Sequence, residues 1–280
     1  MNQNFSQDSA ITFVGGGNMA TALIRGLIKK GLFSEKKIFV IDSNPLALAR
    51  LEADYGVVPV AQPLLDTSWC NQTSLVVWAV KPQHMRSVCE SLSTLSKYLL
   101  HLSVAAGITS GSFGKWLGTK RVVRAMPNTP ALIGMGQTAL FASPEISHLE
   151  RSQIETVIKG CGEFIWFDDE RLLDAVTALS GSGPAYVFYL LEALTRAGED
   201  LGLSAEQAKK LAIGTFMGAS HLAHQSSDPL SSLRENVTSK GGTTEAALSY
   251  LNTKKVGLEL QNAVKAAFVR AQQLGAEFGK

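Results

Sequence analysis

Residues 14–20 read Val14-Gly15-Gly16-Gly17-Asn18-Met19-Ala20, directly after the apolar run Ala10–Val14 and at the start of a helical pattern. In this G-x-G-x-x-A arrangement Gly15 permits a tight turn, Gly17 lets the backbone approach a pyrophosphate, and Ala20 permits close helix–sheet packing. The helix would direct unpaired N–H groups and its positive dipole end at the phosphates. A plain glycine turn is the alternative, but the strand–loop–helix context favours a dinucleotide site. The predicted coenzyme contacts here are Gly15, Gly17, Asn18, Met19 and Ala20.

Around this loop, the first 167 residues alternate short β-branched runs with helical patterns. The run Leu75–Val80 is apolar on both faces, as expected of a parallel strand that helices cover on both sides. Such alternation predicts a doubly wound α/β domain of Rossmann type. The expected strands are Ala10–Val14, Lys37–Ile41, Leu75–Val80, Leu99–Val104, Arg121–Ala125, Thr138–Ala142 and Glu163–Phe167.

The strand signal ends at Phe167, and the charged cluster Asp168–Arg171 follows it. Beyond this point every segment favours helix, with Pro184 suited to a first helical residue and Ser204 with Gln207 forming a capping box. We therefore expect two domains, a dinucleotide-binding domain at 1–167 and an all-helical domain at 168–280. The expected helices cover 170–180, 184–201, 205–224, 229–238, 243–251 and 254–276.

Composition narrows the class of protein. The chain has a net charge of +2 and its sequence contains no cluster of Lys and Arg, which argues against a nucleic-acid partner. The three cysteines are scattered and include no C-x-x-C pair, which is typical of a reducing compartment. Met1–Ala10 lacks the pattern of a signal peptide, and Pro184–Leu194 is too short to cross a membrane, which takes about 20 apolar residues. We expect a cytoplasmic protein with no membrane partner.

Other chemistries have little support in the sequence. Of the five histidines, His221 and His224 alone could share a helix face, so no metal site is predicted. No Ser–His–Asp or Cys–His order stands out for nucleophilic catalysis. Glu192 interrupts an apolar stretch, and the sequence leaves open whether it is a buried group near the site or a break in the stripe.

The sequence contains features that favour NADH and features that favour NADPH. Asp42 closes the second expected strand, where an acidic residue often binds the ribose 2′-hydroxyl, and this favours NADH. The same residue could equally form a turn without touching a ligand. Ser43 and Asn44 follow and could donate hydrogen bonds to a 2′-phosphate, and Arg50 lies one to two helical turns further on.

A further series of segments makes the chain resemble pyrroline-5-carboxylate reductase from about residue 10 to 270. The last two members are the most specific, and the others also occur in related dehydrogenases. The segments are Ala79-Val80-Lys81-Pro82, Ser103-Val104-Ala105-Ala106-Gly107-Ile108, Arg124-Ala125-Met126-Pro127-Asn128-Thr129-Pro130, Ser180-Gly181-Ser182-Gly183-Pro184-Ala185-Tyr186 and Ser239-Lys240-Gly241-Gly242-Thr243-Thr244.

The resemblance implies NAD(P)H-dependent reduction of 1-pyrroline-5-carboxylate to L-proline, the last step of proline biosynthesis. It favours NADP(H), with Ser43 and Asn44 as donors to the 2′-phosphate, and leaves NAD(H) open. Segments beyond the carboxyl ends of parallel strands should line the nicotinamide half of the cleft. These further predicted contacts are Ala79, Val80, Lys81, Pro82, Ala105, Ala106, Gly107 and Asn128. A structural turn is the alternative for Pro127–Pro130, and Lys81 is given no proton-transfer role.

The loop Ser239–Thr244 runs into a helix and offers backbone N–H groups, which suit a carboxylate. The resemblance places the substrate carboxylate here and the Thr244 hydroxyl near the ring nitrogen, where either Thr244, as the catalytic group, or a water would relay the proton of the nitrogen. One departure is Lys240, where many relatives have proline, and the bare pattern also fits a helix-capping turn. The predicted substrate contacts are Ser239, Gly241, Gly242, Thr243 and Thr244.

The helix Pro184–Leu201 is apolar around nearly its whole circumference, so one neighbouring layer cannot bury it. The resemblance identifies the partner as a second copy, in a homo-oligomer built from dimers through the helical domain, with the small-molecule substrate as the other partner. Two alternatives stay open. One is a related imine or hydroxy-acid dehydrogenase of the same architecture, and the other is a non-catalytic nucleotide-sensing relative, which would not need the loop at 239–244.

Overall fold

A computed structural model describes residues 9–280 of the chain, in two compact units. The sheet unit extends to Ser182 and also contains Ala267–Lys280, and the helical unit is Gly183–Ala266. The predicted lack of a signal peptide concerns a segment that lies almost entirely outside the described residues. Over residues 9–280, no helix is long and apolar enough to cross a membrane.

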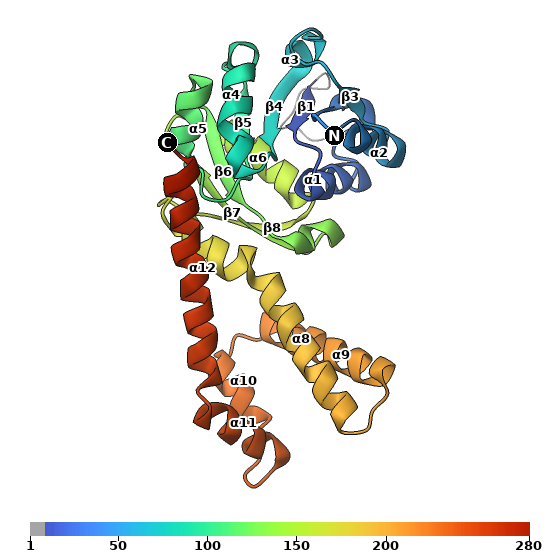
Figure 1. Ribbon diagram of the computed structural model, residues 1–280, viewed down its shortest axis with the longest axis vertical. Helices are drawn as coiled ribbons and strands as arrows, with labels where there is room; N and C mark the ends of the chain where they lie inside the picture. Colours follow the sequence, from blue (N-terminus) through green and yellow to red (C-terminus); the bar gives the residue numbers. More distant parts are fainter. Residues whose placement is uncertain (1–8) are drawn as a thin grey trace. The chain divides into compact units, whose positions relative to one another are not determined.

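The sheet unit contains one eight-stranded sheet of order β3-β2-β1-β4-β5-β6-β7-β8 (Figure 1). All neighbouring strands are parallel except β6 and β7. The predicted Rossmann-type class is confirmed, and each of the seven expected strands is present. The strands are β1 (Ala10–Val14), β2 (Ile38–Ile41), β3 (Val58–Val60), β4 (Thr73–Trp78), β5 (Leu100–Ser103), β6 (Val122–Met126), β7 (Gly136–Ala142) and β8 (Gly162–Trp166).

Helices cover both faces of this sheet because successive strand residues point to opposite sides. In β1, Ile11 and Phe13 join one buried cluster and Ala10 and Val14 join the other. Helices α1, α2 and α6 contribute to the first cluster, and α3, α4 and α5 contribute to the second. The helices are α1 (Asn18–Lys29), η1 (Glu35–Lys37), α2 (Pro45–Tyr55), α3 (Ser68–Gln72), α4 (Pro82–Ser96), α5 (Ser110–Leu117), η2 (Thr129–Ile133), α6 (His148–Lys159), α7 (Leu172–Val176) and the π-helical turn η3 (Thr177–Gly181).

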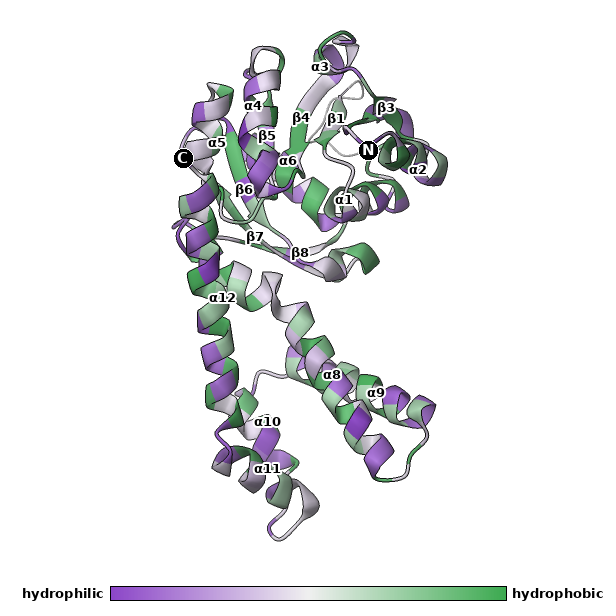
Figure 2. Cartoon of the chain, viewed as in Figure 1, coloured by the Kyte–Doolittle hydropathy of each residue, from purple (hydrophilic) through white to green (hydrophobic). Residues whose placement is uncertain are grey.

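The helical unit has little interior of its own. Ala208 and Ala212, on α9 at its contact with α8, are the buried residues of Gly183–Ala266. Large apolar side chains such as Phe188 and Met217 are exposed, and Figure 2 shows hydrophobic residues along α8 and α9. The predicted capping box at Ser204 is confirmed. The helices are α8 (Gly183–Asp200), α9 (Ala205–Gln225), α10 (Leu230–Asn236), α11 (Thr243–Thr253) and α12 (Val256–Phe278), whose last turns belong to the sheet unit.

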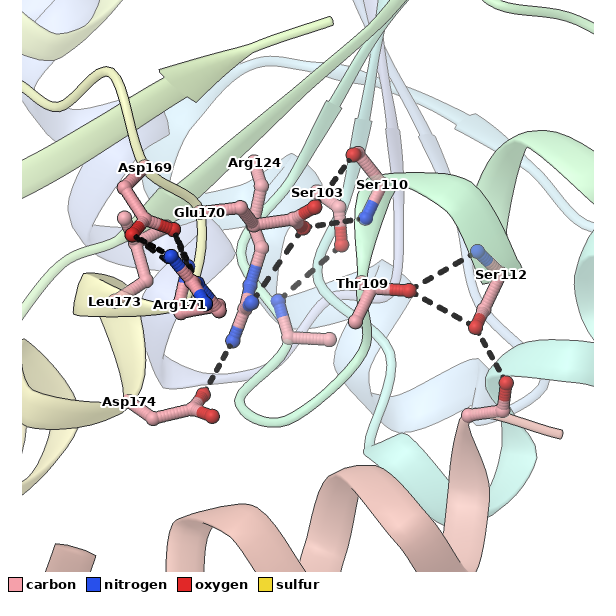
Figure 3. A network of polar contacts seen from close by, with 12 residues as sticks. Ser103, Thr109, Ser110, Ser112, Arg124, Asp169, Glu170, Arg171, Leu173 and Asp174 are labelled. Carbon is pink, nitrogen blue, oxygen red and sulfur yellow. Dashed lines mark hydrogen bonds and ion pairs between the residues drawn. The ribbon is translucent and has the colours of Figure 1, made fainter.

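The units divide between Ser182 and Gly183, whereas the sequence predicts a boundary after residue 167. Ion pairs attach the intervening segment to the sheet. The buried Arg124 guanidinium on β6 lies 3.0 Å from the Asp174 carboxylate and 3.5 Å from that of Glu170 (Figure 3). Glu170 also accepts hydrogen bonds from the N–H and hydroxyl of Ser110. Residues 168–182 therefore pack as part of the sheet unit.

Glu192 and Arg196 form an ion pair one turn apart on α8. Both side chains are more than half exposed. In the single chain Glu192 is therefore exposed and ion-paired, and it interrupts the apolar stripe of α8.

Candidate functional site

The loop after β1 has the backbone geometry that the glycine pattern predicts. Gly15 has φ +98°, and a Cβ there would lie 2.6 Å from the Ala79 carbonyl oxygen, so the position admits only glycine. Gly17 is the N-cap of α1 and has open space where a Cβ would stand. Because glycine has no capping side chain, the first-turn N–H groups of α1 have no side-chain cap. This combination suits a phosphate oxygen.

A cavity of about 860 Å³ opens beside this loop. That volume is within the range of cofactor sites, about 300–1,000 Å³. Lys81 lies there as the N-cap of α4, and Pro82 begins that helix. The predicted residues that line the cavity are Gly15, Gly17, Ser43, Ala79, Val80 and Lys81. Further lining residues carry no motif that would predict them from the sequence: the stretch Ala61–Leu65 and, on α4, His84, Ser87, Val88, Ser91 and Leu92.

The Asp42 carboxylate is engaged within the protein. It accepts hydrogen bonds from the Gly16 N–H at 2.5 Å and the Asn44 N–H at 2.8 Å. It therefore ties the glycine loop to the turn after β2. Asn44 caps α2 through its side-chain oxygen, and the Arg50 guanidinium lies 3.4 Å from the Gly16 carbonyl oxygen. Gly17, Asn44 and Arg50 border a second, smaller cavity of about 380 Å³.

Other predicted coenzyme contacts lie outside the larger cavity. Asn18 is exposed at the start of α1, Met19 is half-buried, and Ala20 is fully buried in the core. Ala105 and Gly107 are buried in the loop after β5, and Ala106 between them is half-buried.

Gly107 and Gly275, on the last turns of α12, approach so closely that a Cβ on Gly107 would lie 2.9 Å from the Gly275 nitrogen. Asn128 is also buried. Its amide NH₂ donates to the Ser180 carbonyl and hydroxyl, and its oxygen accepts from the Gln137 N–H at 2.9 Å. Both ends of the Asn128 amide thus bind protein groups.

The predicted substrate loop connects α10 to α11 in the helical unit. Gly241 has φ +73°, and a Cβ on Gly242 would lie 2.6 Å from the Ser239 hydroxyl oxygen. Gly242 is the N-cap of α11, with no side-chain cap, so the helix begins at Thr243 with open N–H groups. The structure therefore places Ser239, Gly241, Gly242, Thr243 and Thr244 around one helix N-terminus.

Groups set aside on sequence grounds lie in ordinary environments. Among the described residues, no three His, Cys, Asp or Glu side chains gather where they could hold a metal ion. All three cysteines are unpaired, and burial raises the pKa of Cys89 above its usual range and that of Cys161 to about 12. His221 and His224 are exposed on α9.

Two family models match the chain. Residues 10–107 match the model described as NADP oxidoreductase, coenzyme F420-dependent. Residues 170–274 match the model described as pyrroline-5-carboxylate reductase dimerisation.

Relatives match over nearly the full length of both chains. The chain is 39% identical to a pyrroline-5-carboxylate reductase of Pseudomonas aeruginosa, over 96% of this chain and 98% of that one. It is 37% identical to the Haemophilus influenzae enzyme, over 97% of this chain and all of that one.

Solved structures agree with this. A pyrroline-5-carboxylate reductase from Coxiella burnetii superposes with a TM-score of 0.86 at 37% identity, covering 96% of this chain and 99% of that one. A Plasmodium falciparum pyrroline carboxylate reductase with NADP bound gives 0.87 at 26% identity, covering 97% and 100%. Prephenate dehydrogenase from Aquifex aeolicus, at 16% identity and a TM-score of 0.52, shares the fold alone.

Proposed function

The chain belongs to the pyrroline-5-carboxylate reductase family, and we propose that it uses the two glycine-rich loops described above to reduce 1-pyrroline-5-carboxylate to L-proline. The observation that carries this function is 39% identity across nearly the whole of both chains. The two loops support it, because each presents open backbone N–H groups at a helix N-terminus, one in each unit.

NADP(H) is the favoured coenzyme, and NAD(H) is the second to test. The glycine cradle at Gly15 and Gly17 fits a pyrophosphate, and the adjoining cavity is large enough for a nucleotide. The Asp42 carboxylate is held by two backbone N–H groups, which supports a structural role for it over a ribose contact. Asn44 and Arg50 border the smaller cavity, where a cation would favour a 2′-phosphate.

The reaction requires mainly that the protein orient the imine carbon of the substrate relative to the hydride donor. When bound, NADPH supplies the hydride that the imine carbon accepts. The substrate's imine nitrogen is readily protonated, which makes that carbon electrophilic. The chain then has to hold the substrate carboxylate, and the first-turn N–H groups of α11 supply donors and a positive dipole end for it. In this proposal the hydroxyl of Thr244, the second residue of α11, holds a proton at the ring nitrogen.

Other predicted contacts take supporting roles in this proposal. Asn128 fixes the loop after β6 by binding Ser180 and Gln137, so it positions the nicotinamide wall instead of donating to the ribose. Ala105, Ala106 and Gly107 form the adjoining wall, with Gly107 held against Gly275.

The chain forms a homo-oligomer through the region that matches the dimerisation model. We propose that two helical units pack together, because their apolar side chains are exposed in the single chain. The unpaired cysteines accord with a cytoplasmic enzyme.

A spectrophotometric assay tests the proposal. Purified protein should oxidise NADPH, and NADH less efficiently, only when 1-pyrroline-5-carboxylate is supplied, with L-proline as the product. Folded protein that turns over neither coenzyme with this imine would refute the function.

Thr244→Ala should lower kcat by about 10-fold or more. Thr243→Ala is its matched control, because that substitution keeps the backbone N–H and should leave kcat unchanged. Equal kcat in the two variants would remove Thr244 from the reaction.

A further inference from the structure

The loop at 239–242 has two glycine N–H groups, and both are engaged. Gly241 donates its N–H to the Glu245 carboxylate at 2.6 Å. Gly242 donates its N–H to the Ser239 carbonyl oxygen at 3.0 Å. The open donors at this helix N-terminus are therefore those of the first turn of α11, which begins at Thr243.

Glu245 is the third residue of α11, where the acidic half of a capping box stands. Two other helices show the complete box. In α6 and α9 a serine N-cap accepts a hydrogen bond from the third N–H, and the third side chain reaches back to the serine N–H. In α11 the N-cap is Gly242, which has no hydroxyl, and Glu245 reaches one residue further back to Gly241.

Because of this difference, the backbone before α11 is held at Gly241, while the first-turn N–H groups of α11 have no side-chain acceptor. The Glu245 bond fastens Gly241, whose φ of +73° is a conformation that an unrestrained glycine leaves easily. The missing hydroxyl leaves first-turn N–H groups available to an external anion. The same bond also brings a negative charge to the end of the helix that would bind that anion.

We propose that Glu245 is the positioning residue of the substrate-carboxylate loop, acting in two opposed ways. Its carboxylate oxygen holds Gly241 and so preorganises the open N–H groups of α11. Its charge repels the substrate carboxylate and weakens binding. The proposal rests on the proposed function, because it names a residue that tunes the affinity of that same site for its substrate.

Two substitutions separate the two actions. Glu245→Gln keeps an oxygen acceptor for the Gly241 N–H and removes the charge, so KM for 1-pyrroline-5-carboxylate should fall by about threefold at low salt. Glu245→Ala removes both, and because the loop must then be ordered on binding, KM should rise by about tenfold. In both variants kcat and KM for NADPH should stay unchanged.

The control is Glu259→Ala, an exposed acidic residue in the first turn of α12. Its kinetic constants should match those of the wild type. Raising the salt concentration should also remove the difference between the wild type and Glu245→Gln, because screening weakens interactions between exposed charges.

Hydrogen exchange at the Gly241 amide gives a readout without substrate. Exchange should be slow in the wild type and in Glu245→Gln and faster in Glu245→Ala. Equal KM values in Glu245→Gln and Glu245→Ala, or equal exchange in all three proteins, would overturn the proposal. Wild-type protein that shows the expected exchange pattern but does not reduce the imine would refute the proposed function and support the hold of Glu245 on the loop.

Discussion

The two units of the chain differ in how they bury apolar side chains. In the sheet unit, Trp69, Trp78, Phe13 and Phe113 are completely buried. In the helical unit the buried residues are two alanines, on the α9 face that packs on α8. A sheet covered on both faces buries its apolar side chains within the same chain. The helices of the helical unit instead leave apolar side chains exposed, and soluble monomers rarely expose large apolar patches. The sheet unit should therefore be stable alone, and the helical unit should depend on a second copy.

The largest expected effect comes from a pair of equally exposed leucines. Leu211 on α9 and Leu149 on α6 are each 59% exposed in the single chain. If the partner covers α9, Leu211→Asp loses a burial energy of about 1.5–3 kcal/mol per protomer. It also buries an unpaired carboxylate, at several kcal/mol more. The dimer dissociation constant should then rise by more than about 10⁴-fold, with loss of activity.

Leu149→Asp is the control and should leave mass and activity unchanged, because that side chain is expected to face solvent in the dimer as well. Light scattering and the reductase assay, run on both variants at the same protein concentration, check the pair. A dimeric, active Leu211→Asp protein would show that this part of α9 faces solvent in the dimer. It would contradict the expectation that a second copy covers the apolar surface of α9.

The second effect concerns the attachment of residues 168–182 to the sheet. The Arg124 side chain is 3% exposed, and the side chains of Glu170 and Asp174 are 20% and 21% exposed. Arg124→Met leaves both acids without their cation and should lower the free energy of unfolding of the sheet unit by about 3 kcal/mol. Urea unfolding followed by tryptophan fluorescence measures this change.

Arg171 provides the matched control. It pairs with Asp169 in the same segment, but its side chain is 90% exposed. Arg171→Met should leave the unfolding midpoint unchanged, because exposed ion pairs contribute little. If Arg124→Met and Arg171→Met proved equally mild, the buried pair would not be what joins this segment to the sheet.

These ion pairs also show which parts of the fold cannot be predicted from the local sequence. Apolar runs predict seven strands because two covered faces demand continuous apolar residues. The strand Val58–Val60 escapes notice because it has three residues and a central proline, which an edge position tolerates. The charged cluster after Phe167 predicts a domain boundary there. The local sequence does not show that Glu170 pairs with Arg124 on β6, which keeps the segment with the sheet.

In the candidate site, too, local sequence patterns are predictable and contacts between distant residues are not. Both glycine loops are predictable because each is one continuous stretch whose chemistry is local. Asp42 illustrates the limit, since its partner Gly16 lies 26 residues earlier and takes up the carboxylate that the motif assigns to a ribose. The amide of Asn128 is likewise taken up by Ser180, which lies far along the chain.

The third effect is a pH dependence confined to the sheet unit. His101 is fully buried, with Nδ1 accepting from the Trp78 indole N–H at 3.0 Å and Nε2 donating to the Ser96 carbonyl oxygen at 3.0 Å. Burial lowers the pKa of His101 to about 3. The unfolded chain protonates this histidine below pH 6.5 while the folded chain does not, so stability falls as pH falls toward 3. Between pH 6.5 and 4.5 the loss should be about 2 kcal/mol.

His101→Phe should remove this part of the slope, even though it leaves the Trp78 N–H without its acceptor and lowers stability throughout. His221→Ala, at an exposed position on α9, should keep the wild-type slope. Urea unfolding at several pH values compares the three proteins. An unchanged slope in His101→Phe would mean that the buried imidazole is protonated as easily as an exposed one.

The smallest effect uses the two complete capping boxes, one in each unit. Ser147 caps α6 and accepts from the Glu150 N–H at 3.3 Å, and Ser204 caps α9 and accepts from the Gln207 N–H at 3.2 Å. Replacing either serine by alanine should cost about 1 kcal/mol. In Ser147→Ala the sheet unit bears this loss alone, so its unfolding midpoint should fall by the same amount at every protein concentration.

In Ser204→Ala the same local loss should appear in the assembly. Each dimer carries two α9 caps, and folding of the helical unit is expected to be coupled to association, so about 2 kcal/mol should be lost per dimer. The dissociation constant should rise by about 30-fold. Tm should be lower than in the wild type at every protein concentration, and in both proteins it should rise with concentration. Differential scanning calorimetry over a hundredfold range of concentration compares the two variants. A Tm for Ser204→Ala that does not change with protein concentration would mean that the helical unit folds without its partner, because folding coupled to association makes Tm rise with concentration.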